Sequence, residues 1–119
     1  MPQPTIFAID LFGIACDAGA SRRGCVMGPE ALRIAGLVEV LAGLGHTVID
    51  RGDLDAGAPA GPSQTWQSAT HRQAAVLAMA KASSARALQT LQDGRLPVFL
   101  GGDHSLSMGT LAGVAQHCA

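Results

Sequence analysis

Three short segments built around apolar residues, each followed by small or polar residues, mark out this chain. They occupy residues 5–9, 46–50 and 96–100. Their shortness and their content of β-branched residues favour strands over helices. The third run is apolar throughout, which is typical of a strand that is covered on both faces. Pro97 donates no hydrogen bond to a sheet, so it should lie near the start of that strand or on its free side.

Segments with helical signals lie between the runs and after the third one. Residues 28–44 begin with Gly-Pro-Glu, which suits a helix start because proline at the first position loses no needed hydrogen bond. Gly45 follows, where a left-handed cap is common. Residues 64–92 consist mainly of good helix formers. A last helix is expected from an N-cap at Ser105 to about His117. The positions expected on the buried face of the second helix are Val76, Met79, Ala80, Ser83, Ala87, Leu88 and Leu91.

Segments rich in glycine and small residues, at residues 11–27 and 53–63, interrupt this pattern and are predicted to be loops. The overall order is strand, helix, strand, helix, strand, helix. That order predicts an α/β fold of three layers, with a parallel sheet between helices on both faces. Neither loop divides the chain, so residues 1–119 are expected to belong to a single domain.

Composition excludes several classes of protein. Hydrophobic residues make up 48% and charged residues 14% of the 119 residues, which rules out a disordered tail. The net charge of −1 gives no electrostatic footprint for nucleic acid. No apolar run approaches the roughly 18 residues of a membrane span, and the first residues lack a signal-peptide pattern. Three cysteines without a close-spaced motif fit a reducing compartment, so we expect a cytoplasmic protein.

Candidate chemistry follows the predicted strands, because ligands of open α/β sheets bind beyond the carboxyl ends of the strands. The loop after Asp10, residues 50–53 and residues 101–105 should all lie at that edge. In the last segment two glycines allow a tight bend, from which Asp103 and His104 project. A neutral imidazole is a common metal ligand and a common general base, although such a histidine is also often a structural residue.

The other polar candidates are weaker. Asp10, Asp50 and Asp53 could bind a cation, but acidic residues after strands also cap the next helix. The remaining histidines are interpreted as ordinary surface or helix-end residues. A metal site needs about four to six ligands in a fixed geometry. The residues by themselves therefore predict an α/β domain with a site at residues 101–105.

Three segments together resemble the arginase family. They are Asp-Ala-Gly-Ala-Ser-Arg-Arg-Gly at residues 17–24, Met-Gly-Pro-Glu-Ala-Leu-Arg-Ile-Ala-Gly-Leu at 27–37, and Gly-Gly-Asp-His-Ser-Leu-Ser-Met-Gly-Thr at 101–110. The first resembles the substrate-mouth loop of bacterial arginases. The second leans toward arginase, whereas the third also occurs in agmatinases and related ureohydrolases. The resemblance covers nearly the whole chain and corresponds to the N-terminal portion of the family.

The resemblance implies a larger α/β/α domain, of which these are about three strands and three helices. It also implies hydrolysis of L-arginine to L-ornithine and urea with two manganese ions, which lower the pKa of a bridging water. His104 matches the family's first manganese ligand, and no other metal or catalytic residue is implied here. Arg22 and Arg23 either line the cleft mouth or are solvated loop charges. The family often forms trimers or hexamers, so a homo-oligomer is expected.

The family's later segments, which carry its other metal ligands and its catalytic residues, do not occur in this sequence. We therefore expect the isolated chain to be inactive and the outer edge of the third strand to be exposed. Two alternatives remain open. The chain could be part of an agmatinase or another ureohydrolase, or it could be a non-catalytic arginase-like module that pairs through its open edge. A reading frame that continues with an Asp-x-His-x-Asp segment would favour an enzyme.

Overall fold

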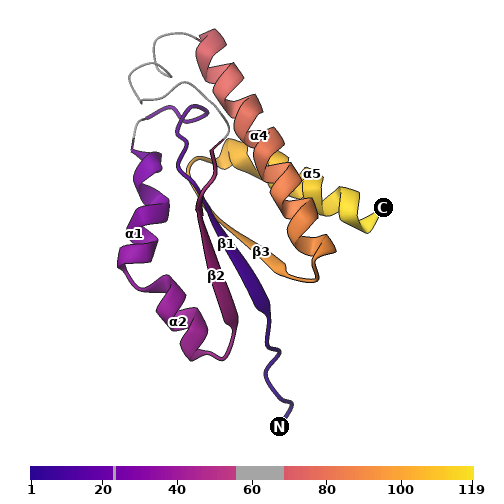
Figure 1. Ribbon diagram of the computed structural model, residues 1–119. Helices are drawn as coiled ribbons and strands as arrows, with labels where there is room; N and C mark the ends of the chain where they lie inside the picture. Colours follow the sequence, from indigo (N-terminus) through magenta and orange to yellow (C-terminus); the bar gives the residue numbers. More distant parts are fainter. Residues whose placement is uncertain (23, 56–68) are drawn as a thin grey trace.

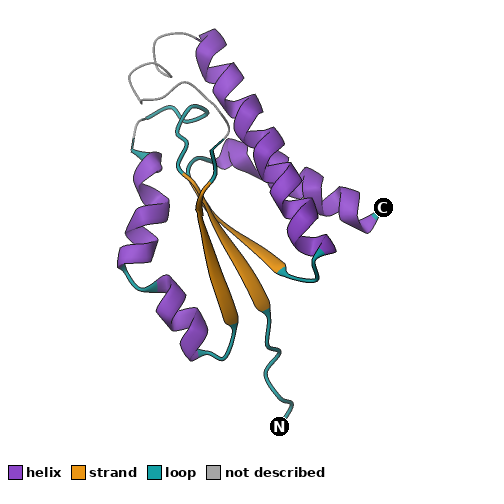
Figure 2. Ribbon diagram, in the orientation of Figure 1, coloured by secondary structure: helices purple, strands orange, loops and turns teal. Residues whose placement is uncertain are grey.

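A computed structural model of the chain describes residues 1–22, 24–55 and 69–119. Three parallel strands form one sheet in the order β2-β1-β3. Helices α1 and α2 lie on one side of the sheet, and α4 and α5 lie on the other (Figure 1, Figure 2). The predicted three-layer α/β/α fold with a parallel sheet is confirmed. The elements are β1 (Ala8–Ile14), α1 (Gly28–Ile34), α2 (Leu37–Gly43), β2 (Thr47–Asp53), α4 (Ala69–Gln92), β3 (Leu96–Gly101) and α5 (Ser107–Cys118), with short 3-10 turns η1 (Cys25–Met27) and η2 (His104–Leu106).

The central strand β1 is longer than the sequence pattern predicted. We expected a strand at residues 5–9 and a loop from Leu11, but β1 continues to Ile14. Leu11, Phe12 and Ile14 are at most 2% exposed, because β1 has a hydrogen-bonded strand on each side and helices on both faces. Gly13 pairs with both neighbouring strands, and this position needs glycine because a Cβ would collide with the carboxylate of Asp53. Small residues therefore mark close packing here rather than a loop.

Asp10 lies inside β1, so its predicted place at the ligand-binding edge is wrong. Asp10 is only 4% exposed. Arg95 Nε donates to Asp10 Oδ1 at 2.6 Å, and Arg51 Nη2 lies 3.3 Å from the same oxygen. Arg95 directly precedes β3, so this ion pair joins the amino ends of parallel strands. A buried carboxylate needs such partners, because burying it unpaired is costly.

The helix predicted at residues 28–44 is divided into α1 and α2. Gly36 adopts a left-handed backbone with φ 93°, which stops α1 and lets α2 start in a new direction. α1 then packs near β1 and β3, whereas α2 packs on β2. The left-handed cap predicted at Gly45 is confirmed, with φ 97°.

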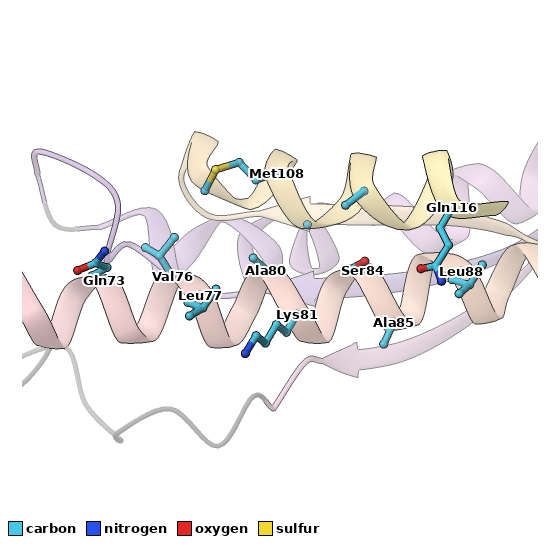
Figure 3. A pocket seen from close by; sticks show the side chains of 12 residues that line it. Gln73, Val76, Leu77, Ala80, Lys81, Ser84, Ala85, Leu88, Met108 and Gln116 are labelled. Atoms are coloured by element: carbon cyan, nitrogen blue, oxygen red, sulfur yellow. The ribbon is translucent and has the colours of Figure 1, made fainter. Parts of the chain in front are cut away.

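Helix α4 begins at Ala69, and the part of the predicted helix before it lies outside the described residues. Ser83 and Ala87 are fully buried on the face that the sequence predicted. Gly109 of α5 packs so closely on α4 that a Cβ would collide with the carbonyl of Ala80 and the hydroxyl of Ser83. An apolar groove of about 680 Å³ runs along this contact, with Met108 on its α5 side (Figure 3).

No helix in the described ranges is long and apolar enough to cross a bilayer.

The α4–α5 contact predicts opposite effects for two glycine substitutions. Gly109→Ala should lower the free energy of unfolding by about 1–3 kcal/mol, because the new methyl group must push two helices apart. Gly43→Ala in α2 is the matched control, since a Cβ there meets nothing within 4 Å. It should be neutral or stabilising by up to about 1 kcal/mol. Urea denaturation of both variants measures this, and equal losses would contradict the close packing.

Candidate functional site

The turn after β3 packs directly against the end of β1. Gly102 has φ 54°, and a Cβ there would lie 2.5 Å from the carbonyl oxygen of Ile14 and 2.7 Å from that of Cys16. The next residue, Asp103, donates its backbone N–H to the oxygen of Cys16 at 3.0 Å. Gly102 therefore serves the close approach of two backbone segments, as the position of the glycine pair in the sequence suggested.

The carboxylate of Asp103 connects the two segments a second time. Its Oδ2 accepts the backbone N–H of Gly19 at 2.7 Å. Its Oδ1 accepts the backbone N–H of Ser105 at 2.9 Å and also the hydroxyl of Ser105. Asp103 is thus the N-cap of η2, and the cap predicted at Ser105 is wrong. The aspartate takes this role because its side chain reaches the N–H two residues ahead, while Ser105 acts as a donor to it.

His104 lies at the carboxyl end of β3, as the sequence predicted. Its side chain is exposed, and within the described part of the chain its ring has no hydrogen-bond partner. The residue borders a cavity of about 180 Å³ whose apolar lining includes Ile14, Phe99 and Leu106. An exposed imidazole without a competing bond can bind a metal or accept a proton. Residues 1–22, 24–55 and 69–119 contain no group of three His, Cys, Asp or Glu side chains that could hold a metal ion.

Asp50 and Asp53 lie in β2 and form ion pairs with Arg33 of α1. Arg33 Nε donates to Asp50 Oδ2 at 2.9 Å, and Arg33 Nη1 donates to Asp53 Oδ1 at 2.6 Å. Burial alone would raise the pKa of Asp50, but hydrogen bonds from Arg33 and Gly52 N–H and the charge of Arg33 outweigh it and lower that pKa. The hydrogen bonds to Asp50 and Asp53 raise the pKa of Arg33. These two aspartates are neither metal ligands gathered at His104 nor helix caps.

The other candidates are divided between the two ends of the sheet. His46 accepts the backbone N–H of Phe7 at 3.1 Å through Nδ1, at the end of the sheet opposite His104. Cys16 is buried beside the turn, and burial raises the pKa of its thiol. Arg22 is exposed, and Arg23 lies outside the described residues. A role for either arginine at a cleft mouth stays a prediction.

Comparison with known proteins decides the family. A family model, described as the arginase family, matches residues 7–119. The chain belongs to the arginase family. The predicted resemblance to the N-terminal portion of this family is confirmed.

Curated arginases from Bacillus caldovelox and Agrobacterium fabrum are 40% and 43% identical to the chain over 109 residues. Each alignment covers 92% of the chain but only 36% and 33% of these relatives. Among solved structures, the arginase from Bacillus cereus has a TM-score of 0.78 at 34% identity and covers 93% of the chain and 35% of that protein. The native structure of the arginase from Bacillus caldovelox gives 0.71 at 39% identity, covering 93% and 37%. The chain thus spans about a third of the length of the curated arginases it matches.

Within this arginase-family chain, sequence reasoning missed the part that Asp103 plays at the site. An aspartate followed two residues later by serine is a signal for a cap at the aspartate, and it was available in the sequence. The bond from Gly19 was not, since Gly19 lies 84 residues earlier and its backbone N–H carries no sequence signature.

The Arg33 network predicts how the stability of this arginase-family chain depends on pH. The folded-state pKa of Asp50 lies below its unfolded value, so its contribution is complete above about pH 5. That contribution is lost as the pH falls through the folded pKa. Arg33→Gln should therefore lower stability at pH 7 and weaken the loss of stability on acidification. Urea denaturation at a series of pH values measures both effects. Arg86→Gln, at an exposed position of α4, is the control, and identical pH profiles for the two variants would contradict the assignment.

Proposed function

We propose that this chain forms the N-terminal part of a manganese-dependent arginase that hydrolyses L-arginine to L-ornithine and urea, with His104 as one metal ligand. The observation that carries the proposal is the exposed imidazole of His104 at the carboxyl end of β3. It lies at the edge of the sheet where ligands of α/β folds bind. Its ring has no hydrogen-bond partner among the described residues.

The chemistry of the donors fits a partial manganese site. Manganese is bound by hard carboxylate oxygens together with some imidazoles, and His104 supplies an imidazole. The neighbouring Asp103 is engaged by three donors from Gly19 and Ser105, so it serves the backbone and not the metal. The described ranges hold no group of three His, Cys, Asp or Glu side chains that could complete a metal site. The remaining ligands belong to the part of the arginase length that this chain does not span.

When bound, the metal pair lowers the pKa of a coordinated water and so supplies a nucleophile near neutral pH. The residues of this chain orient and border that site. Asp103 holds the turn from which His104 projects. Ile14, Phe99 and Leu106 form an apolar surface beside it.

Several properties of the whole protein belong to the same proposal. The chain alone has no arginase activity, because one imidazole cannot form a two-metal site. L-arginine is preferred to agmatine as the substrate because the relatives described above carry the name arginase. The complete enzyme is a cytoplasmic homo-oligomer, a trimer or hexamer, with no nucleic acid or membrane partner. The net charge of −1 agrees with the exclusion of nucleic acid.

A chimaera tests this function. Residues 7–119 are joined to the part of the Bacillus caldovelox arginase that follows the portion aligned with this chain. The chimaera should release urea from L-arginine only with manganese, whereas the 119-residue chain should release none. His104→Ala should weaken manganese binding, followed by electron paramagnetic resonance, by about 10- to 100-fold or more.

His117→Ala is the matched control, because His117 lies near the far end of α5 and should leave manganese affinity unchanged. Turnover of agmatine in place of arginine would reject the substrate. Unchanged manganese affinity in His104→Ala would reject the metal ligand, and this readout does not depend on turnover. Metal-independent release of urea would reject the mechanism itself.

A further inference from the structure

We propose that Asp103 is a positioning residue that fixes His104 and the loop after β1 (residues 15–20) as one unit. The metal-binding part of this inference rests on the proposed function, whereas the contact itself does not. We call residues 15–20 the β1 loop. The consequence is that the strength of metal binding at His104 depends on a hydrogen bond to a residue far from it in the sequence.

The two oxygens of Asp103 perform different tasks. Oδ1 accepts both donors of Ser105 and so shapes the turn that carries His104. Oδ2 accepts the N–H of Gly19 at 2.7 Å and so holds the β1 loop. Hydrogen bonds to an ionised carboxylate are about twice as strong as neutral ones, so a single side chain can hold both segments.

Close packing at Gly19 supports the same conclusion independently. A Cβ at Gly19 would lie 2.6 Å from the Ser105 hydroxyl oxygen, 2.7 Å from its Cβ and 3.0 Å from Asp103 Oδ1. The backbone of the β1 loop therefore lies directly on the turn. The bond from Asp103 N–H to the Cys16 carbonyl oxygen at 3.0 Å adds another connection.

His104 depends on this unit because its ring makes no hydrogen bond of its own within the described residues. Its backbone is held instead: the His104 carbonyl oxygen accepts the Ser107 hydroxyl at 2.9 Å and the Ser107 N–H, and Asp103 caps the turn. A metal ligand that is about 0.5 Å or 10–20° out of place binds poorly. Loosening the turn from the β1 loop should therefore weaken metal binding without removing any ligand.

Asp103→Asn separates the two tasks. Asparagine is an equally good N-cap and keeps one oxygen for Ser105. Its NH₂ group then faces the N–H of Gly19, so the side-chain bond to Gly19 is lost while the backbone bond from Asp103 N–H to Cys16 remains. Global stability, from urea denaturation, should change little. Exchange of the Gly19 amide hydrogen in the 119-residue chain should accelerate by about tenfold or more, because a bond to a charged acceptor is gone.

Ser105→Ala is the matched control, since it removes a donor to Oδ1 and leaves the Gly19 bond in place. Exchange at Gly19 should then stay close to the wild-type rate. Gly19→Ala disturbs the same contact from the β1 loop, because its methyl group would crowd Ser105 and Asp103, and it should accelerate exchange at residue 19. Adding Ser105→Gly removes two of the three atoms that crowd the new methyl group, so the double variant should recover slower exchange.

Manganese affinity of the chimaera tests the consequence at the metal. Asp103→Asn and Gly19→Ala should each weaken it by about 10- to 100-fold, and Ser105→Gly should partly restore the second. Unchanged Gly19 exchange in Asp103→Asn overturns the contact. Normal manganese affinity in both variants, with weakened affinity in His104→Ala, overturns the positioning role alone. If His104→Ala has no effect either, the proposed function fails, while the exchange data still decide the contact.

Discussion

The candidate site depends on the hydrogen bonds that the carboxylate of Asp103 accepts. This carboxylate joins the loop that leaves β1 to the turn that leaves β3, although the two segments are 84 residues apart in the chain. Hydrogen bonds to a charged group are about twice as strong as neutral ones, so these contacts order the turn and the loop locally. Without this connection the sheet would still pair β1 with β3, but the turn that presents His104 would have only its bond to the Cys16 carbonyl and its close packing.

Acidic side chains elsewhere in the sheet are neutralised by arginine. Asp10 is enclosed by Arg95 and Arg51 near the amino ends of the strands, and Arg33 binds both aspartates of β2. These pairs explain why a chain with several aspartates after predicted strands gathers no metal cluster in its described residues. Removing one partner from the buried Asp10 pair should cost about 3–5 kcal/mol, whereas the pairs of Arg33 with Asp50 and Asp53 are solvent-exposed and contribute about 1 kcal/mol or less each. The imidazole at the end of β3 is left available for a ligand.

The sequence predicted which strands and helices form better than it predicted the residues at which they begin and end. Apolar runs identified all three strands, and the alternation with helices predicted the parallel order. The extension of β1 through Ile14 was missed because Asp10 looked like the end of a strand, and its partner Arg95 is 85 residues away. The division of the predicted helix at Gly36 was also missed. The left-handed φ of Gly36 redirects the chain there, and a single sequence does not reveal that φ. His104 was identified because it belongs to a compact sequence motif. The hydrogen bond from Gly19 N–H to Asp103 was missed because a backbone donor has no sequence signature.

Membership of the arginase family gives this arrangement a functional context, and the chain spans about a third of the curated relatives it matches. The central claim is that the His104 ring is a manganese ligand. Anomalous diffraction from a manganese-loaded crystal of the chimaera tests it most directly. We predict a manganese peak within coordination distance of a ring nitrogen of His104, at the carboxyl end of β3. A manganese ion bound with that ring outside its coordination sphere would contradict the account.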